Sequence, residues 1–468
     1  MDDTREIAKT KMNLKPTQVL AVGFLALILL GTLLLRLPAS NVGGISASWV
    51  DCLFTSTSAV CVTGLNVVPT IHQWSTFGQV VIMLLIQAGG LGFMTLISCV
   101  FLILGKKITL RERMIIQESL NQNNLRGLVR LVRGVALATF LFEAVGAVIL
   151  TFRFLKDYPL DRSIFMGIFH SISAFCNAGF DIVGNASLAP YISDLPLNIT
   201  MCTLIVVGGL GFIVWSDLFH MLQKVRKGNH SFSVALRQMT LHTKVVLTMT
   251  AGLIIAGAAL FFAFECLNPA TFGVLPLGDK ISASFFQSVT CRTAGFSEIN
   301  QNSMTYASQL LSMILMFVGG SPSSTAGGIK TVTMAVLLIT LISVSQGRRT
   351  THIYRKDIPL FVLQKAITIF LVALGVICAS TMLLTFTEAG SPFRHEFLDL
   401  LFENVSAFTT TGLSTGITPA LSAAGKLIIS LEMYIGRIGP IAIASALSRR
   451  QRAFSEVVEY PEESVMVG

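Results

Sequence analysis

The chain has 468 residues, of which 53% are hydrophobic and only 13% are charged. Soluble globular chains carry about 25% charged residues, so this composition excludes an ordinary soluble protein as well as a disordered or collagen-like chain. The formal net charge of +9 does not predict a nucleic-acid partner, because Lys and Arg gather on the cytoplasmic side of membrane proteins. The composition predicts an all-α integral membrane protein.

The chain begins with a polar segment, residues 1–15, followed by residues 16–35, which contain no charged residue. About 20 apolar residues suffice to cross a bilayer, so this stretch predicts a first membrane helix and not a cleaved signal peptide. Residues 52–105 also contain no charge. A single helix of that length would measure about 80 Å, whereas the hydrocarbon core is about 30 Å thick. Because residues 62–69 favour a turn, we expect a short helix, a loop and a full span ending at Gly105.

Later charge-poor stretches bring the predicted total to eight membrane crossings. They are residues 134–152, interrupted only by Glu143, then 195–216, 245–264, 299–329, 366–387, 404–425 and the run after Lys426. Most Lys and Arg residues lie near the two ends of the chain and in three linkers, at 106–133, 224–244 and 348–365. Positive residues favour the cytoplasmic side, so both termini and these linkers are predicted to be cytoplasmic.

Four glycine segments recur along the chain at nearly constant spacing. They are Cys61–Leu65, Cys176–Phe180, Arg292–Phe296 and Thr409–Leu413, with glycines at positions 64, 179, 295 and 412. These glycines are 115, 116 and 117 residues apart, and a phenylalanine stands ten residues before each one, at Phe54, Phe169, Phe285 and Phe402. A second glycine cluster follows 24 to 29 residues later, from Gly89, Gly208, Gly319 and Gly436. A single glycine of this kind is an ordinary turn, but four at one spacing indicate an internal repeat.

Each repeat is predicted to contain a helix, a pore helix that enters the membrane partway, a glycine loop and a second helix. Two crossings return the chain to its starting side, so the four repeats are parallel and can surround a central pore with pseudo-fourfold symmetry; inverted repeats would need an odd number of crossings. The predicted divisions are 1–15 (cytoplasmic N-terminus), 16–105 (pore repeat 1), 106–223 (linker and pore repeat 2), 224–347 (linker and pore repeat 3 with a gating loop), 348–452 (linker and pore repeat 4) and 453–468 (C-terminal tail).

The predicted loops suit a cation pathway. Irregular backbone is tolerated inside a membrane where it lines a pore. Glycine loops can turn carbonyl oxygens toward an axis and replace the water shell of a cation, and the C-terminal ends of the pore helices add partial negative charge. An alternating-access secondary transporter of a small solute is the alternative; a membrane scaffold is a third hypothesis, which gives the four uncharged loops no role. Seven dispersed histidines and few paired acids indicate no catalytic site, so an enzyme is not expected.

The loop sequences Thr-Gly-Leu, Ala-Gly-Phe, Thr-Ala-Gly-Phe and Thr-Gly-Leu resemble those of the Trk/Ktr/HKT superfamily of potassium transporters. The likeness covers nearly the whole chain and is greatest to the KtrB type of membrane subunit. It implies uptake of K⁺, selected by the glycine that all four loops keep, with sodium dependence left open and no organic cofactor in this chain. The implied selectivity-filter residues, which act through backbone carbonyls, are Val62, Thr63, Gly64, Asn177, Ala178, Gly179, Thr293, Ala294, Gly295, Thr410, Thr411 and Gly412.

A glycine- and serine-rich stretch in the third repeat cannot remain a regular helix. It resembles the family's intramembrane gating loop and consists of Gly319, Gly320, Ser321, Pro322, Ser323, Ser324, Thr325, Ala326, Gly327 and Gly328. Lys330 follows this stretch, and Arg437 resembles the basic residue that lines the pore in the family. Cations within a membrane usually serve function, so we expect Arg437 to be an electrostatic barrier or a gate partner. A buried pair of Arg437 with Glu432 is the alternative.

Two further charged residues fall inside predicted membrane segments. Arg292 is expected to anchor its own glycine loop and not to line the pore, because a cation on the axis would repel potassium. Glu143 is expected to stabilise helix packing by pairing with a cation, with ion sensing as the second hypothesis.

The resemblance also implies partners and a location. The C-terminal tail is expected to lie at a homodimer interface. The protein is expected in the plasma membrane of a bacterium. The basic linkers are expected to receive a cytosolic RCK-type ring that binds nucleotide, although they could equally fix topology or contact anionic lipid. Gly89–Gly92 and Gly208–Gly211 lie in apolar helices and not after strands, so the chain itself has no Rossmann nucleotide site.

Overall fold

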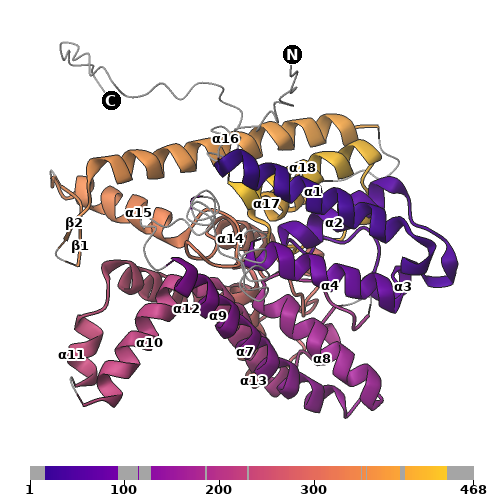
Figure 1. The fold of residues 1–468 in the computed structure, drawn as a ribbon. Helices are drawn as coiled ribbons and strands as arrows, with labels where there is room; N and C mark the ends of the chain where they lie inside the picture. Colours follow the sequence, from indigo (N-terminus) through magenta and orange to yellow (C-terminus); the bar gives the residue numbers. More distant parts are fainter. Residues whose placement is uncertain are drawn as a thin grey trace, which may run out of the picture.

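The computed structural model describes residues 16–92, 114, 128–184, 187–228, 231–348, 350–354, 356–390 and 396–439. Nearly all secondary structure in these ranges is helical, as an all-α membrane protein requires (Figure 1). The only described strands are β1 (His352–Ile353) and β2 (Lys356–Asp357), which pair antiparallel. The N-terminal segment 1–15, much of the linker 106–133 and the tail 453–468 lie outside the described residues, and so do the predictions made for them.

Four long apolar helices are the outer frame of the protein. They are α1 (Pro16–Arg36), α7 (Leu128–Phe154), α12 (Leu241–Glu265) and α16 (Leu360–Glu388). Each is long and apolar enough to cross a membrane, and about 30% of its residues are buried inside the protein. Leu, Ile, Val and Phe side chains cover the remaining surface, which therefore suits contact with lipid.

A short helix follows each long one. The short helices are α2 (Trp49–Cys61), α8 (Leu160–Phe175), α13 (Leu277–Thr290) and α17 (Phe397–Thr409). Each carries an aspartate in its first turn, where a negative charge stabilises the helix dipole; these are Asp51, Asp161, Asp279 and Asp399. Each also donates one side-chain hydrogen bond to a carbonyl of the preceding long helix. The donor and acceptor pairs are Ser56–Ile28, Ser171–Glu143, Ser288–Ile254 and Asn404–Ile377, at 2.6 to 3.0 Å.

The second helix is interrupted in the second and third predicted repeats, and in the first and fourth it ends at a glycine beyond which the chain lies outside the described residues. These helices are α4 (Thr76–Leu91), α9 (Leu195–Leu210) with α10 (Phe212–Arg226), α14 (Tyr306–Phe317) with α15 (Thr331–Ser345), and α18 (Ala423–Ile438). Helices α9 and α10 meet at 99°. A glycine with positive φ ends α4, α9 and α18, at Gly92, Gly211 and Gly439. The third repeat was expected to depart from the others at this helix, and residues 318–330 separate α14 from α15 there. The second repeat is also bent, at Gly211, whose φ a helix excludes.

These interruptions affect the number of spans. Among the described residues, four helices are long and apolar enough to span a membrane, or five if the bent pair α9–α10 counts as one span. The predicted count of eight crossings therefore stays a prediction. The remaining described helices are short: α3 (Thr70–Gln73), α11 (Phe232–Arg237), and the 3-10 turns η1 (Pro38–Ser40), η2 (Val42–Gly44), η3 (Ala189–Tyr191), η4 (Gln301–Ser303) and η5 (Thr418–Ala420).

The buried apolar side chains form two main clusters. One joins α1, α2 and α4 to α7, α8 and α9 and extends to α18, whereas the other joins α12, α13 and α14 to α16 and α17. Figure 1 shows α1, α16, α17 and α18 side by side, so the first and last parts of the chain meet. The C-terminal parts of the short helices and the loops that follow them are buried, whereas the first turns of these helices expose several large side chains.

Candidate ion pathway

Each short helix leads into a three-residue loop with the same backbone conformation. We call residues 62–64, 177–179, 293–295 and 410–412 the glycine loops. The first residue of each loop has a left-handed φ of 53° to 65°, at Val62, Asn177, Thr293 and Thr410. The last residue is a glycine with φ between 68° and 92°, at Gly64, Gly179, Gly295 and Gly412. Left-handed angles are uncommon for residues other than glycine, so their recurrence at matched positions indicates one shared loop structure.

The glycine loops contact one another in a closed order. The α-carbon of each loop glycine lies beside the backbone of the next loop, so that an added β-carbon would meet a carbonyl oxygen there. The glycine and carbonyl pairs are Gly64–Ala178, Gly179–Ala294, Gly295–Thr411 and Gly412–Thr63. The added carbon would lie 2.5 Å from the oxygen in the first pair and 2.8 Å in the second, and it would collide outright in the other two. The structure thus brings the four predicted loops together around one point and leaves no room there for a side chain.

A hydroxyl near the end of each short helix holds the glycine loop that follows. The hydroxyls of Ser58 and Ser406 accept hydrogen bonds from the loop glycines' N–H groups, and those of Ser173 and Thr290 donate to the carbonyls just beyond the loop, at 2.7 to 3.1 Å. The sequence analysis missed these residues. A small hydroxyl residue six positions before the loop glycine, in three of the four repeats, was the available signal.

The hydrogen-bonded turn that leads from α13 into the third glycine loop is one residue shorter than its counterparts. Its Ala294 N–H bonds to the carbonyl of Thr290, four residues earlier, whereas the equivalent N–H in the other loops bonds to a carbonyl five residues earlier. Phe285 therefore has the repeated spacing in the sequence but not the repeated position in the structure. Phe285 is 44% exposed, and Phe286 takes the buried position that Phe54, Phe169 and Phe402 occupy elsewhere.

Residues 319–328, the intramembrane loop, separate α14 from α15 and pack against other repeats. The loop bonds to the bend between α9 and α10 through Ser321 N to Gly209 O at 3.0 Å and Phe212 N to Ser323 O at 2.9 Å. The hydroxyl of Thr325 donates to the carbonyl of Phe175, at the end of α8. Gly327 packs so closely on Thr410 that a β-carbon there would collide with the threonine hydroxyl. The intramembrane loop therefore lies directly against the fourth glycine loop and against the end of α8, which leads into the second glycine loop.

Arg437 ties the intramembrane loop to the first repeat. It lies in the last turn of α18, and its guanidinium donates to the carbonyls of Thr325 and Gly89, and to that of Gly90 at 3.3 Å. One side chain thus joins the fourth repeat, the intramembrane loop and the end of α4. Glu432 forms no ion pair with Arg437 among the described residues, so the alternative of a buried pair is not found.

Two more cations hold the ends of the intramembrane loop. Lys330 Nζ donates to Ala326 O at 2.7 Å, and Arg292 Nη2 donates to Gly319 O at 3.3 Å. Arg292 is 7% exposed and directly precedes the third glycine loop. We expected Arg292 to anchor its own loop; in the structure it anchors the beginning of the intramembrane loop instead. The glycine loop and the intramembrane loop are therefore linked through one side chain.

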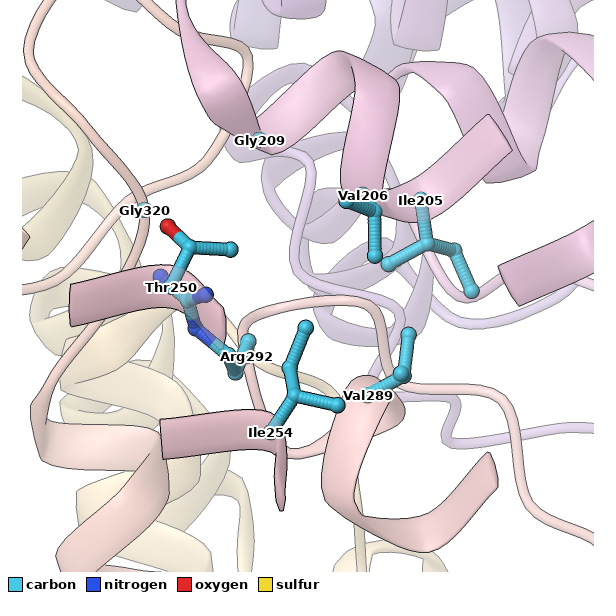
Figure 2. A pocket seen from close by; sticks show the side chains of 8 residues that line it. All are labelled: Ile205, Val206, Gly209, Thr250, Ile254, Val289, Arg292 and Gly320. Carbon is cyan, nitrogen blue, oxygen red and sulfur yellow. The ribbon is translucent and has the colours of Figure 1, made fainter. Parts of the chain in front are cut away.

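A small pocket lies beside Arg292. Figure 2 shows the arginine reaching past Thr250 toward Gly320 of the intramembrane loop. The remaining lining is mostly aliphatic, from α9, α12 and α13: Ile205, Val206, Gly209, Ile254 and Val289. This pocket borders one side of the intramembrane loop, where the N–H groups of Ser321 and Thr325 bond to the carbonyls of Gly209 and Gly208 of α9.

Glu143 contacts uncharged groups. It is 5% exposed, and its carboxylate accepts hydrogen bonds from the Gln87 amide at 3.2 Å and from the Cys176 thiol at 3.9 Å. The expected pairing with a cation is therefore not found among the described residues. Because Gln87 precedes the end of α4 and Cys176 precedes a glycine loop, Glu143 stabilises the contact between the first two repeats.

Comparison with known proteins identifies the family. Residues 4–456 match the TrkH family profile, described as a cation transport protein. The chain is 40% identical to the Ktr system potassium uptake protein B of Bacillus subtilis over 97% of both chains, and 38% identical to the potassium/sodium uptake protein NtpJ of Enterococcus hirae over 98% and 99% of the two chains. Its fold matches the crystal structure of the potassium transporter TrkH from Vibrio parahaemolyticus with a TM-score of 0.68 and 18% identity, over 94% and 86% of the chains. The expected resemblance is thereby confirmed, and the chain is a multi-pass membrane protein that belongs to the TrkH family of cation transport proteins.

Proposed function

We propose that this chain carries potassium ions into the cell through a central pore whose selectivity filter is made by the four glycine loops. The observation that carries the proposal is the closed order in which each loop glycine packs on the backbone of the next loop. Four backbone loops around one axis can replace the hydration shell of a cation with carbonyl oxygens. The four repeats then have pseudo-fourfold symmetry, which the shared loop angles and the shared bonds to the long helices support.

The expected ion is potassium. The relatives named as potassium uptake proteins cover nearly the whole of this chain, and the name of one of them includes sodium as well. The short helices α2, α8, α13 and α17 end at the glycine loops, so their partial negative charges favour a cation there. The proposal leaves open whether sodium accompanies potassium.

The intramembrane loop is the proposed gate. It packs against Thr410 and the end of α8, and it is held by Arg292, Lys330 and Arg437. Glycine and serine predominate in the loop, so it can move at low steric cost.

A cytosolic nucleotide-binding ring is the proposed regulator, and the chain is proposed to act as a homodimer in the bacterial plasma membrane with both termini cytoplasmic. Helices α10 and α11 support a docking role, because they extend away from the body of the protein (Figure 1). They expose both apolar and basic side chains, including Phe219, Phe232, Lys224 and Arg226. Such mixed surfaces are typical of protein interfaces.

The test is ion flux into proteoliposomes that contain this chain, alone and with its regulatory ring. Potassium and rubidium flux should exceed sodium flux, and Gly295→Leu should abolish it, because a β-carbon at Gly295 collides with Thr411. Gly347→Leu is the control, since Gly347 also has a positive φ but no neighbour within 4 Å of an added carbon. Flux of neither cation, even with the ring present, would favour the alternating-access transporter of a small solute.

A further inference from the structure

Each short helix carries a second polar residue one turn before the hydroxyl that holds its glycine loop. Residues three apart lie on the same face of a helix, so the two side chains of a pair point the same way. The pairs are Thr55 and Ser58, His170 and Ser173, Gln287 and Thr290, and Glu403 and Ser406. The first member of each pair directly follows the buried phenylalanine of its repeat and is at most 1% exposed. A polar group buried so completely needs a partner inside the protein.

In the second and third repeats, that partner lies in the segment beyond the glycine loop. His170 Nδ1 donates to a carbonyl of its own helix, so Nε2 accepts from Ile182 N, at 3.5 Å. The Gln287 and Gln301 amides bond to each other in both directions, at 2.8 and 3.3 Å. The short helix therefore contacts the chain both before and after the loop.

The fourth repeat has an acid at this position, and it makes the closest contacts of the set. Ser414, two residues beyond Gly412, donates its hydroxyl to Glu403 Oε1 at 2.6 Å, and the Thr418 hydroxyl donates to the same oxygen. The two hydroxyls lie 3.1 Å apart, and Ser414 Oγ also accepts from Gly416 N at 2.8 Å. One carboxylate oxygen thus holds the segment that leaves the fourth glycine loop.

Helix α17 consequently holds the fourth glycine loop at both ends. Ser406 accepts from Gly412 N at 3.0 Å, and Glu403 accepts from Ser414. Glu403 takes part in none of the ion pairs among the described residues, and its Oε2 has no hydrogen-bond partner there. Its contacts with the loop segment are therefore the hydrogen bonds that Oε1 accepts.

We propose that Glu403 is a positioning residue for potassium selectivity. Through Ser414 and Thr418 it fixes the far end of the fourth glycine loop, and with it the loop carbonyl oxygens that replace the water shell of the ion. It acts as a hydrogen-bond acceptor, so its charge is dispensable. The inference rests on the proposed function, because it assigns Glu403 to the same filter.

The experiment measures thermal unfolding of the purified full-length chain in nanodiscs, with KCl or NaCl replacing choline chloride at constant ionic strength. The ratio of the sodium midpoint to the potassium midpoint reports selectivity and does not depend on how much protein is folded. Glu403→Leu should lower this ratio at least about fivefold, because leucine accepts no hydrogen bond. Glu403→Gln should keep the ratio within about twofold of the wild type, because the amide oxygen still accepts from both hydroxyls.

Glu388→Leu is the matched control. Glu388 is a buried acid of the same repeat, 5% exposed, and it accepts from the Ser422 hydroxyl at 2.6 Å and from Ser422 N at 3.2 Å, at the beginning of α18. Its loss should lower the unfolding temperature and leave the ratio of midpoints unchanged. An equal fall in the ratio here would mean that selectivity follows stability, which overturns the role of Glu403.

The remaining outcomes separate Glu403 from the filter. A potassium-selective wild type with an unchanged ratio in Glu403→Leu overturns the proposal while the filter stands, and so does an equal fall in Glu403→Gln, which would make the charge responsible. A wild type without a midpoint for either cation contradicts the proposed filter and the role of Glu403 together. If Glu403→Leu does not fold, Ser414→Ala decides, because Thr418 still satisfies the carboxylate: the ratio should fall at least about threefold, and no change overturns the proposal.

Discussion

Two glycines in the fourth repeat have the same backbone conformation and opposite surroundings. Gly412 has φ 91° and Gly416 has φ 97°, so any other residue would be strained at both positions. An added β-carbon at Gly412 collides with the carbonyl of Thr63, whereas at Gly416 it meets nothing within 4 Å. A substitution at Gly416 therefore tests the effect of the backbone angle alone, whereas the same substitution at Gly412 also tests the effect of lost space in the ring.

Gly412→Ser is expected to lower selectivity for potassium over sodium by about tenfold or more, because the new side chain displaces the Thr63 carbonyl from the ring. Gly64→Ser should act in the same way. Competition of sodium against rubidium uptake in proteoliposomes measures the effect. Gly416→Ser should leave the competition unchanged, and an equal loss in both variants would show that backbone strain alone is responsible.

Arg437→Ala is expected to increase ion leak in the absence of the regulator. The variant removes the donors that hold Thr325 of the intramembrane loop and the Gly89 carbonyl of α4. Arg437→Lys keeps the positive charge but replaces the planar guanidinium, which reaches two carbonyls at once, by one compact ammonium group. The lysine variant should therefore leak less than the alanine variant and more than the wild type. Passive potassium efflux from liposomes measures the leak. A variant that loses stability without leaking would assign Arg437 to packing alone.

At the residue scale, the sequence was sufficient to locate the glycines that meet in the structure, but not to identify the partners of buried charges. Loop glycines repeat at one spacing, so Gly64, Gly179, Gly295 and Gly412 could be found without a structure. The partner of a buried charge could not. Glu143 was expected to pair with a cation, but its carboxylate accepts hydrogen bonds from the Gln87 amide and the Cys176 thiol. Nothing in the sequence marks either residue as its partner.

Among the elements, the intramembrane loop differs most from its counterparts. In the first, second and fourth repeats, the first glycine of the second cluster packs on a carbonyl at or near the end of a short helix, as Gly89 on Val60, Gly208 on Phe175 and Gly436 on Phe408. In the third repeat the corresponding Gly319 packs on Gly327 of the same loop. In the third repeat, residues of the intramembrane loop therefore pack on Gly319, where in the other repeats the end of a short helix packs on the corresponding glycine.

Deletion of Ser321–Thr325 is expected to raise potassium flux and to reduce its dependence on the regulator. The deletion removes the bonds to Gly209 and Phe212, and with them the contact that holds the loop across the second repeat. Flux with and without the regulatory ring, in the same liposomes, measures both effects. Unchanged flux would make the segment a structural kink and not a gate.

At the element scale, the sequence predicted the helix–loop order but not the local register. The interval from glycine to glycine stays nearly constant, and this hides the missing residue between α13 and the third glycine loop. Phe285 and Phe286 are adjacent, so only the direction of the helix face decides which one is buried. Similarly, the sequence does not distinguish Gly211 from the neighbouring helical glycines, and only its φ of 90° shows that the helix ends there.

For the whole molecule, the basic linkers predict one orientation. Cysteine labelling tests it in a variant where exposed Cys378 is replaced by serine. An impermeant thiol reagent should label Ile45→Cys from outside the cell, and Gln346→Cys only after permeabilisation, because the two exposed positions lie at opposite ends of their repeats. The reverse pattern would contradict the assignment of cytoplasmic termini.

The proposed fourfold arrangement follows from the sequence because each predicted repeat has its own glycine loop. What the sequence could not show is how the first and last units join. Lys426 of α18 forms an ion pair with Asp51 of α2 at 2.9 Å, and the Tyr434 hydroxyl donates to Ala21 O of α1 at 2.8 Å. These partners are nearly the length of the chain apart, and no spacing rule connects them.

The contact between Gly412 and Thr63 has a consequence for biosynthesis. The ring of loop glycines closes only when the last loop reaches the first, so it cannot form before residue 412 has been made. Contacts between parts of a chain that are distant in sequence form late, so formation of the ring coincides with completion of the fourth repeat. A chain truncated before residue 412 would therefore lack the complete ring.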